Sequence, residues 1–147
     1  MTPAERDEAG RRPLTESERD ELLDQPLAGV WSTLTPEAKI HSVPVYYVRR
    51  NREFRVLTER DSVKTGNVLA SGRATLCVEM VIDGSDRRFV TAEGPVRVEQ
   101  PVTLEDVLAL AERYGGHYAD FPNTDSFDEG VILVLQTERW IAWSDAD

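Results

Sequence analysis

One stretch of the sequence, Leu57 to Asn67, places hydroxyl and basic side chains between a predicted strand and a predicted helix. Backbone N–H groups at the start of a helix lack partners within the helix, and the helix dipole favours an anion there. The side chains that could join these groups around one phosphate are Arg60, Ser62 and Lys64. The stretch therefore predicts a phosphate-binding site.

The same residues also fit a purely structural role. Ser62 is a favoured helix-capping residue, and Lys64 would then be a solvated side chain on the first turn. Glu59 and Asp61 lower the positive potential beside the predicted site. The residues alone thus leave two hypotheses open, a phosphate site and a capped surface helix.

Other familiar chemistry is missing from the sequence. No glycine-rich dinucleotide-binding turn, Walker A loop or Gly-x-Ser-x-Gly elbow occurs. His41, His117 and Cys77 are far apart in the sequence and lack metal-ligand spacing. We therefore assign no catalytic residue and predict no metal site.

Composition narrows the classes of function. The chain has 147 residues, which suits one domain, and a net charge of −10, which argues against nucleic acid as a partner. No apolar run approaches the roughly 20 residues that cross a membrane. Cys77 is the single cysteine and no signal peptide is evident at the start, so we predict a cytoplasmic protein without disulfides.

Three helices should position these residues. Residues 1–13 are charged and show no apolar period, which predicts a disordered leader before a single domain of residues 14–147. A capping box of Thr15 and Glu18 predicts a first helix that ends before Leu27. The other predicted helices cover 62–70, capped by Asp61 or Ser62, and 104–114, capped by Thr103 and ended by Gly115 and Gly116. The loop from 115 to 130 is long and acidic, so it is either a lid or a solvated connection.

The rest of the chain reads as β-strands joined by polar turns. The predicted strands are Gly29–Leu34, His41–Val48, Glu53–Thr58, Ala74–Ile82, Arg88–Glu99 and Val131–Trp143. Turns at 35–39 and 83–86 predict hairpins between the first two strands and between the fourth and fifth. Six short strands with few helices favour a small antiparallel barrel over a doubly wound sheet.

An ordered series of short runs in this sequence resembles a known family. The runs are Gly29-Val-Trp-Ser-Thr-Leu-Thr-Pro-Glu, His41-Ser-Val-Pro-Val-Tyr-Tyr-Val, Phe54-Arg-Val-Leu-Thr with Ser62-Val-Lys-Thr-Gly-Asn, Arg73-Ala-Thr-Leu-Cys-Val and Val90-Thr-Ala-Glu-Gly-Pro-Val. From about Leu14 to Trp143 the chain is similar to the pyridoxamine 5′-phosphate oxidase-like proteins. Within them it most resembles the actinobacterial flavin- and deazaflavin-dependent oxidoreductases.

The resemblance implies a six-stranded antiparallel split β-barrel that forms a homodimer, with two cofactor sites at the subunit interface. Matched by position, Ser62, Lys64 and Asn67 fall on the phosphate-contacting segment, and Thr58 falls at the preceding strand end. The residues that the resemblance places beside the ring system are Ser42, Val43, Pro44, Val45 and Tyr46. It also implies that Trp140 and Trp143 could approach the ring from the partner subunit.

The chain departs from the family at several positions. Ala38 and Ile40 stand where glycine and proline are frequent, and Val63 and Gly66 occupy positions that are commonly basic. The loss of two cations weakens the case for a polyglutamylated anionic tail. FMN, which carries one phosphate, would be less affected.

Three functions follow from the resemblance. The first is an oxidoreductase that uses coenzyme F-420 or FMN on an unidentified small organic substrate, with Tyr46, Tyr47, His41 or water as the proton donor. The second is a non-catalytic protein that binds a flavin, a deazaflavin or haem for storage or sensing. Pyridoxamine 5′-phosphate oxidase activity itself ranks last, because the C-terminal Arg-x-His-type substrate segment of that enzyme is missing.

Overall fold

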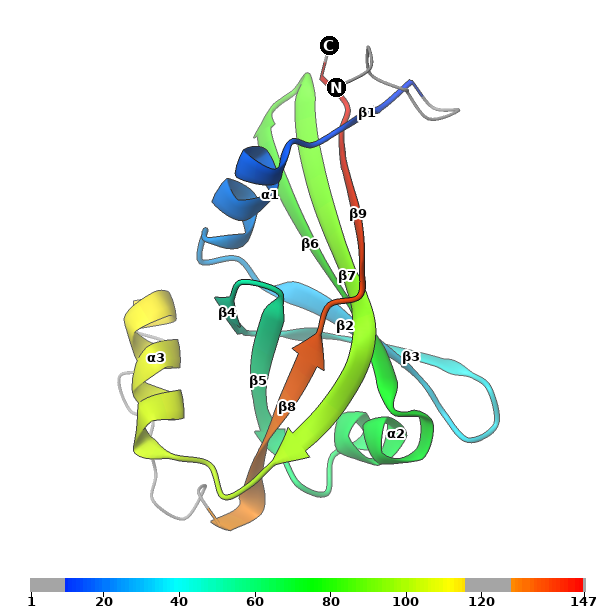
Figure 1. Cartoon of the computed structure of the whole chain (residues 1–147), viewed down its shortest axis with the longest axis vertical. Coiled ribbons are helices and arrows are strands. Elements are labelled where there is room, and N and C mark those ends of the chain that lie inside the picture. Colours follow the sequence, from blue (N-terminus) through cyan, green and yellow to red (C-terminus); the bar gives the residue numbers. More distant parts are fainter. Residues whose placement is uncertain (1–9, 116–127, 147) are drawn as a thin grey trace.

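The computed structural model describes residues 10–115 and 128–146 as an antiparallel sheet with three short helices (Figure 1). The strands are β1 (Arg12–Pro13), β2 (Gly29–Leu34), β3 (Ile40–Val45), β4 (Val48–Arg50), β5 (Glu53–Glu59), β6 (Arg73–Asp83), β7 (Asp86–Glu99), β8 (Gly130–Gln136) and β9 (Arg139–Ser144). The helices are α1 (Glu16–Leu23), α2 (Val63–Ser71) and α3 (Leu104–Tyr114).

The strands form one curved sheet in the order β3-β2-β6-β7-β8-β5-β4, with β9 on β7 and β1 on β9. Each of these neighbours pairs antiparallel. β3 and β4 stand at the two ends of the path, and only Tyr46 and Tyr47 separate them in the chain. The mainly antiparallel split-barrel architecture predicted from the sequence is thus confirmed, in an open form with more strand segments than the six predicted.

Two predicted strands are each divided in the structure. The predicted strand His41–Val48 breaks at Tyr47, whose N–H is bonded to Tyr114 Oη at 3.1 Å and whose hydroxyl donates to Leu23 O at 3.0 Å. The predicted strand Val131–Trp143 breaks at residues 137 and 138, whose N–H groups donate to Arg52 O and Glu93 O. In both cases a partner distant in sequence captures the backbone, which local patterns could not predict.

The folded part of the chain begins earlier than the predicted boundary at residue 14. Arg12 pairs with Ser144 and Pro13 with Trp143, so these two residues add a short strand to β9. The guanidinium of Arg12 also makes two 3.0 Å hydrogen bonds to Glu18. Residues 1–9 of the predicted leader, and residues 116–127 of the predicted lid loop with His117, lie outside the described residues.

The three helices match their predicted cores and caps. Thr15 and Glu18 form the predicted capping box of α1, Ser62 caps α2, and α3 has the predicted bounds with Thr103 as its cap. Leu22 and Leu23 of α1 are buried in the barrel core beside Trp31, Phe54 and Leu76. α3 packs against β8 and β5 through a second cluster made of Val102, Val107, Ile132 and Val134, with Leu57 packed against it.

Glu18 joins the first helix to β1 and β7 through charge. Its carboxylate accepts hydrogen bonds from Arg12 and from the Thr15 N–H, and lies 3.3 Å from Arg88. The hydrogen bonds from Arg12 and the Thr15 N–H outweigh burial and lower the pKa of Glu18 from 4.5 to about 2. A lowered pKa stabilises the fold above the unfolded value, and this contribution is lost as the pH falls from about 4.5 towards 2.

We therefore expect Glu18→Gln to lower the free energy of unfolding at pH 7, by about 1.5–3 kcal/mol for hydrogen bonds to a charged group. The difference from the parent protein should shrink as the pH falls from 4.5 towards 2, because the parent carboxylate is then protonated as well. Urea denaturation at a series of pH values measures this. Glu21→Gln on the exposed side of the same helix is the control. A difference that stays constant with pH would contradict the assignment.

Candidate functional site

A cleft of about 400 Å³ lies where β5 ends and α2 begins. The residues that line it are Leu57, Thr58, Glu59, Ser62, Lys64, Glu129 and Gly130. Three of the predicted phosphate residues, Thr58, Ser62 and Lys64, are therefore brought together by the strand–helix junction.

Hydroxyl groups hold this junction in place. Ser62 is the N-cap of α2 and accepts a 3.2 Å hydrogen bond from the Thr65 N–H, while Thr58 Oγ1 donates to Ser62 Oγ at 3.3 Å. The buried hydroxyl of Thr65 donates to Glu59 O at 2.9 Å. The next amides of the first turn, those of Val63 and Lys64, have no acceptor inside the helix and are available to an anion by the geometry of any helix N-terminus.

The charges of the cleft suit one phosphate and little more. Lys64 is half-buried and is the single cation among the described residues that line the cleft, whose lining also contains the carboxylates Glu59 and Glu129. Arg60 lies outside this lining: its backbone N–H donates to Glu129 O at 2.7 Å, and its side chain bonds to Asp128 O. Arg60 thus ties the end of β5 to residues 128–129.

Asn67 is not brought to the cleft. Its side chain is buried, with 4% exposed, and its amide donates to Thr33 Oγ1 at 3.0 Å. Three positions after Lys64, Asn67 faces β2, so it links α2 to the barrel. The amide of Asn67 thus has a partner within the fold, and its contact with a phosphate stays a prediction.

We expect Asn67→Ala to destabilise the fold by about 1–3 kcal/mol, because it leaves the buried Thr33 hydroxyl without its donor. Cofactor affinity should stay within about twofold, which is within about 0.4 kcal/mol. Urea denaturation and cofactor titration of the same preparation measure the two effects. Thr33→Val combined with Asn67→Ala should recover part of the stability. A large loss of affinity in a stable Asn67→Ala protein would return Asn67 to the binding site.

The strand predicted to lie beside the ring, residues 42–46, divides into two faces. Ser42 and Pro44 are exposed, whereas Val45 is buried, as strand alternation requires. Tyr46 follows the strand and packs on Tyr114 with ring centroids 4.5 Å apart. None of the five residues lines the cleft. Their role beside a cofactor ring stays a prediction.

The face that carries Ser42 and Pro44 continues across five strands. Cross-strand register aligns one row of residues that is wholly or partly exposed, namely Pro44, Val30, Cys77, Thr91 and Ile141. The adjacent row is more polar and contains Ser42, Ser32, Thr75, Glu93 and Arg139. We call these two rows the outer face. An apolar row on an open sheet is a candidate surface for a second chain.

The tryptophans and tyrosines predicted near the ring have other contacts. Trp140 packs partly buried against the core, with its ring 5.9 Å from that of Phe54 and the Arg19 guanidinium 4.3 Å from its centroid. Trp143 lies on β9 opposite Phe89. Tyr47 is fully buried, and burial raises the pKa of its hydroxyl far above the usual value. Tyr47 is therefore a poor proton donor.

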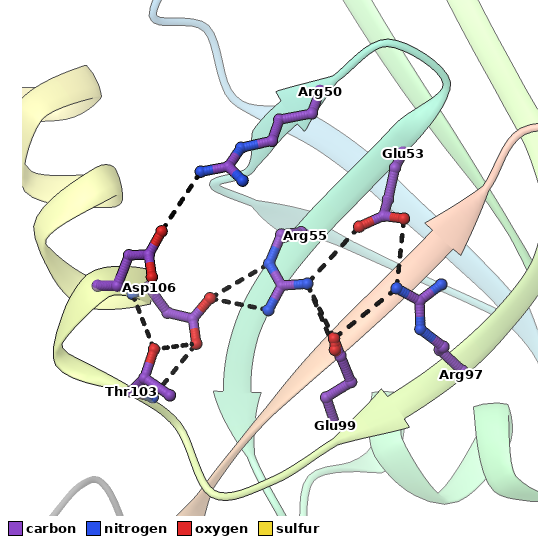
Figure 2. A network of polar contacts seen from close by, with 8 residues as sticks. Arg50, Glu53, Arg55, Arg97, Glu99, Thr103 and Asp106 are labelled. Atoms are coloured by element: carbon purple, nitrogen blue, oxygen red, sulfur yellow. Dashed lines mark hydrogen bonds and ion pairs between the residues drawn. The ribbon is translucent and has the colours of Figure 1, made fainter.

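A second cavity, of about 760 Å³, lies between α3 and the outer surface of β5 and β8. Leu57, Leu110 and Ile132 contribute apolar surface to it. Figure 2 shows Arg55 among carboxylates at one wall, 2.9 Å from Glu99 and 2.8 Å from Asp106. Burial opposes ionisation of Asp106, but hydrogen bonds from Thr103 and Arg55 outweigh it and lower the pKa of Asp106.

Sequence analysis missed this charged network. Arg55 pairs with residues 44 and 51 positions away, and nothing in the local pattern of β5 indicates such partners. Further ion pairs join Arg97 to Glu53 and Arg50 to Glu105. The two cavities share Leu57, so the cleft at α2 adjoins the cavity under α3 along β5. We call the second cavity the α3 trough.

The sequence of the chain matches a known family over almost its whole length. A family model described as pyridoxamine 5′-phosphate oxidase matches residues 15–144. The chain belongs to this family. Among curated proteins, none matches the sequence.

Several solved structures have a fold similar to that of this chain. An F420 reductase is 21% identical with a TM-score of 0.70, over 83% of this chain and 94% of that one. An FAD-binding protein from Mesorhizobium loti is 17% identical with a TM-score of 0.71, over 91% and 97%. HutZ, the haem storage protein from Vibrio cholerae, is 12% identical with a TM-score of 0.69, over 87% and 94%. At these identities the likeness concerns the fold.

Neither a metal-ligand cluster nor a candidate membrane-spanning helix occurs among the described residues. They contain no group of three or more His, Cys, Asp and Glu side chains placed to hold a metal ion. Within residues 10–115 and 128–146, no helix is long and apolar enough to cross a membrane.

Proposed function

We propose that this member of the pyridoxamine 5′-phosphate oxidase family is an oxidoreductase that binds a flavin or deazaflavin, FMN or coenzyme F-420, and acts on a small organic substrate. The observation that carries the proposal is the cleft at the start of α2, where Thr58, Ser62 and Lys64 meet. Family membership and the resemblance of the F420 reductase and the FAD-binding protein in fold support it. The cytoplasmic location predicted from the sequence is part of the proposal.

The donor set of the cleft fits the phosphate of such a cofactor. An ammonium, the Ser62 hydroxyl and the amides of a helix N-terminus can all donate hydrogen bonds to anionic oxygen. When bound, the flavin or deazaflavin supplies hydride transfer, which none of the twenty side chains can perform. Lys64 and Ser62 would hold the phosphate end, and the Thr58–Ser62 hydrogen bond would fix Ser62 for that role.

The proposal includes a homodimer, because in one copy of the chain part of the strand predicted to lie beside the cofactor ring, residues 42–46, is exposed to solvent. Ser42 and Pro44 are exposed on the outer face, next to Val30, which is 46% exposed. A second copy packed against the apolar row would shield this strand from water, and stable dimers commonly bury more than about 1,200 Å². Light scattering should therefore give twice the monomer mass at micromolar concentration.

A second candidate function is cofactor binding without turnover. It is favoured by the resemblance to HutZ, a haem storage protein, and to a haem-binding protein from Mycobacterium smegmatis with a TM-score of 0.58. The cleft supplies no histidine to ligate haem iron among its described lining residues. We therefore rank haem binding below flavin or deazaflavin binding.

The test is the absorbance spectrum of the purified protein, followed by titration with FMN, coenzyme F-420 and haem. Micromolar binding of FMN or a deazaflavin, with reduction of the bound ring by a suitable donor and reoxidation by a substrate, supports the oxidoreductase. Binding without any turnover supports the second candidate. Binding of haem alone would overturn the proposal.

A further inference from the structure

The charges around the cleft restrict which member of the flavin and deazaflavin group can bind. Lys64 shares the cleft with Glu59 and Glu129, so the lining carries one positive and two negative side chains. Asp61 and Asp128, both exposed, add negative charge beside it, and Arg60 contributes the one further cation in this segment. A single phosphate can use Lys64 and the helix amides, whereas Arg60, the remaining cation, lies outside the lining and is bonded to Asp128 O at 3.4 Å and 3.9 Å from Asp61.

The α3 trough repeats this imbalance next to the cleft. Its lining contains two arginines, Arg50 and Arg55, against four carboxylates, those of Glu53, Glu99, Glu105 and Asp106. Figure 2 shows that Arg55 is already engaged by Glu53, Glu99 and Asp106, at 3.6, 2.9 and 2.8 Å. Arg50 lies 3.6 Å from Glu105. Arg97 pairs with Glu53 and Glu99 from outside the lining, so the network holds three arginines against four carboxylates. A chain of carboxylates that left the cleft along β5 would therefore meet a small excess of negative charge and arginines that are already paired.

Coenzyme F-420 differs from FMN in this respect. Beyond its phosphate it carries a tail of glutamates, each with a negative charge at pH 7, whereas FMN ends at the phosphate. Like charges separated by several ångströms near a protein surface repel by an amount that salt reduces. The overall charge of −10 adds a long-range repulsion of the same sign.

We infer that the cleft selects a cofactor that ends in a single phosphate, and that the acidic residues of the cleft and the α3 trough reject a polyglutamylated tail. The inference rests on the proposed function, since it concerns the same cleft. It narrows that function to FMN or a deazaflavin without a tail. The family alone does not decide this point, because the charges belong to this chain.

Isothermal titration with three probes tests the inference: FMN, coenzyme F-420 with its glutamate tail, and the same 8-hydroxy-5-deazaflavin ring ending in a 5′-phosphate. We expect the two probes without a tail to bind with similar affinity, and the tailed coenzyme about tenfold more weakly at low salt. The difference in affinity between the tailed and untailed probes should become smaller with added salt, because screening weakens repulsion between exposed charges. Equal affinity for the tailed and untailed deazaflavins would overturn the inference while leaving the proposed function intact.

A charge reversal identifies the residues responsible. Glu59→Lys in the cleft lining should tighten coenzyme F-420 several-fold more than it tightens FMN. Glu21→Lys makes the same change of charge on α1, which lies in the upper half of Figure 1 whereas α2 lies in the lower half, and should affect the two cofactors equally. Equal responses to Glu59→Lys and Glu21→Lys would contradict a local origin. If none of the three probes binds the folded protein, the inference and the proposed function both fail.

Discussion

Replacing Lys64 by alanine should weaken FMN binding about 10- to 100-fold, because a hydrogen bond to a charged group contributes about 1.5–3 kcal/mol. Lys64 is the single cation among the described lining residues of the cleft, and the nearby Arg60 side chain is bonded to Asp128 O instead. The fold should be unaffected, since the ammonium extends from the first turn of α2 and takes no part in the capping hydrogen bonds of Ser62. Isothermal titration of FMN, with melting temperatures alongside, measures both quantities.

The chain supplies its own control for this experiment. Lys39 is the one other lysine, and it lies exposed in the turn between β2 and β3. Lys39→Ala makes the same change of charge and should leave FMN affinity within about twofold. If Lys64→Ala and Lys39→Ala bind FMN equally well, Lys64 is a solvated helix residue and the cleft is not a phosphate site.

Replacing Gly94 by alanine should prevent folding or destabilise the protein by several kcal/mol, on the order of the largest single-residue effects. A Cβ at this position would lie 1.9 Å from Gln136 O and 3.1 Å from Glu138 N, both backbone atoms. Gly94 is the point on β7 where the chain crosses from β8 to β9, and the Glu138 N–H donates to Glu93 O there. Because the obstacle is backbone, no change of rotamer relieves it.

Gly66→Ala provides the matched comparison. Nothing lies within 4 Å of a Cβ at Gly66, which occupies an interior position of α2. Alanine should stabilise this helix by up to about 1 kcal/mol relative to glycine. Circular dichroism and urea denaturation compare the two variants. A folded Gly94→Ala protein of normal stability would show that the crossing of β7 is looser than the structure indicates.

Elements governed by local chemistry could be predicted from the sequence. The Thr15–Glu18 capping box marks α1, the Thr103 cap marks α3, and strand β2 has its predicted bounds. The fold class followed from strand spacing and from resemblance, and family membership confirms that resemblance. For the two helices and β2 the information lies within a few residues of the element, whereas the fold class needed the order of elements along the whole chain.

Features that depend on distant partners escaped prediction. Tyr47 leaves its strand because Tyr114, 67 residues later, takes its N–H, and Asn67 turns to the core because Thr33 accepts its amide. The resemblance implied that Asn67 contacts the cofactor, and only the structure shows that its amide has a partner within the fold. The α3 trough could not be foreseen for the same reason, since its walls come from five separate elements.

The site itself was predicted in part. Thr58, Ser62 and Lys64 meet because a strand end, a cap and a first helical turn are adjacent in the chain, so spacing alone placed them. Glu129 reaches the same cleft from the start of β8, and neither spacing nor charge near Lys64 pointed to it. Because the carboxylate of Glu129 comes from a distant part of the sequence, the net charge of the cleft lining could be determined only from the structure.

Among the described strands, β7 pairs with β6 and β9 along its first half and with β8 along its last residues. Over residues 88–93 it is flanked by β6 on one edge and β9 on the other, and over residues 96–99 it pairs with β8. The strands β9 and β1 on one side, and the strands β8 and β5 beside the cleft on the other, are therefore connected through the single backbone of β7 (Figure 1). Because β7 pairs with strands on both sides, neither side can separate without disrupting the other, and the domain should unfold as one cooperative unit. A substitution near β1 that lowers the free energy of unfolding should therefore also lower the stability of the cleft.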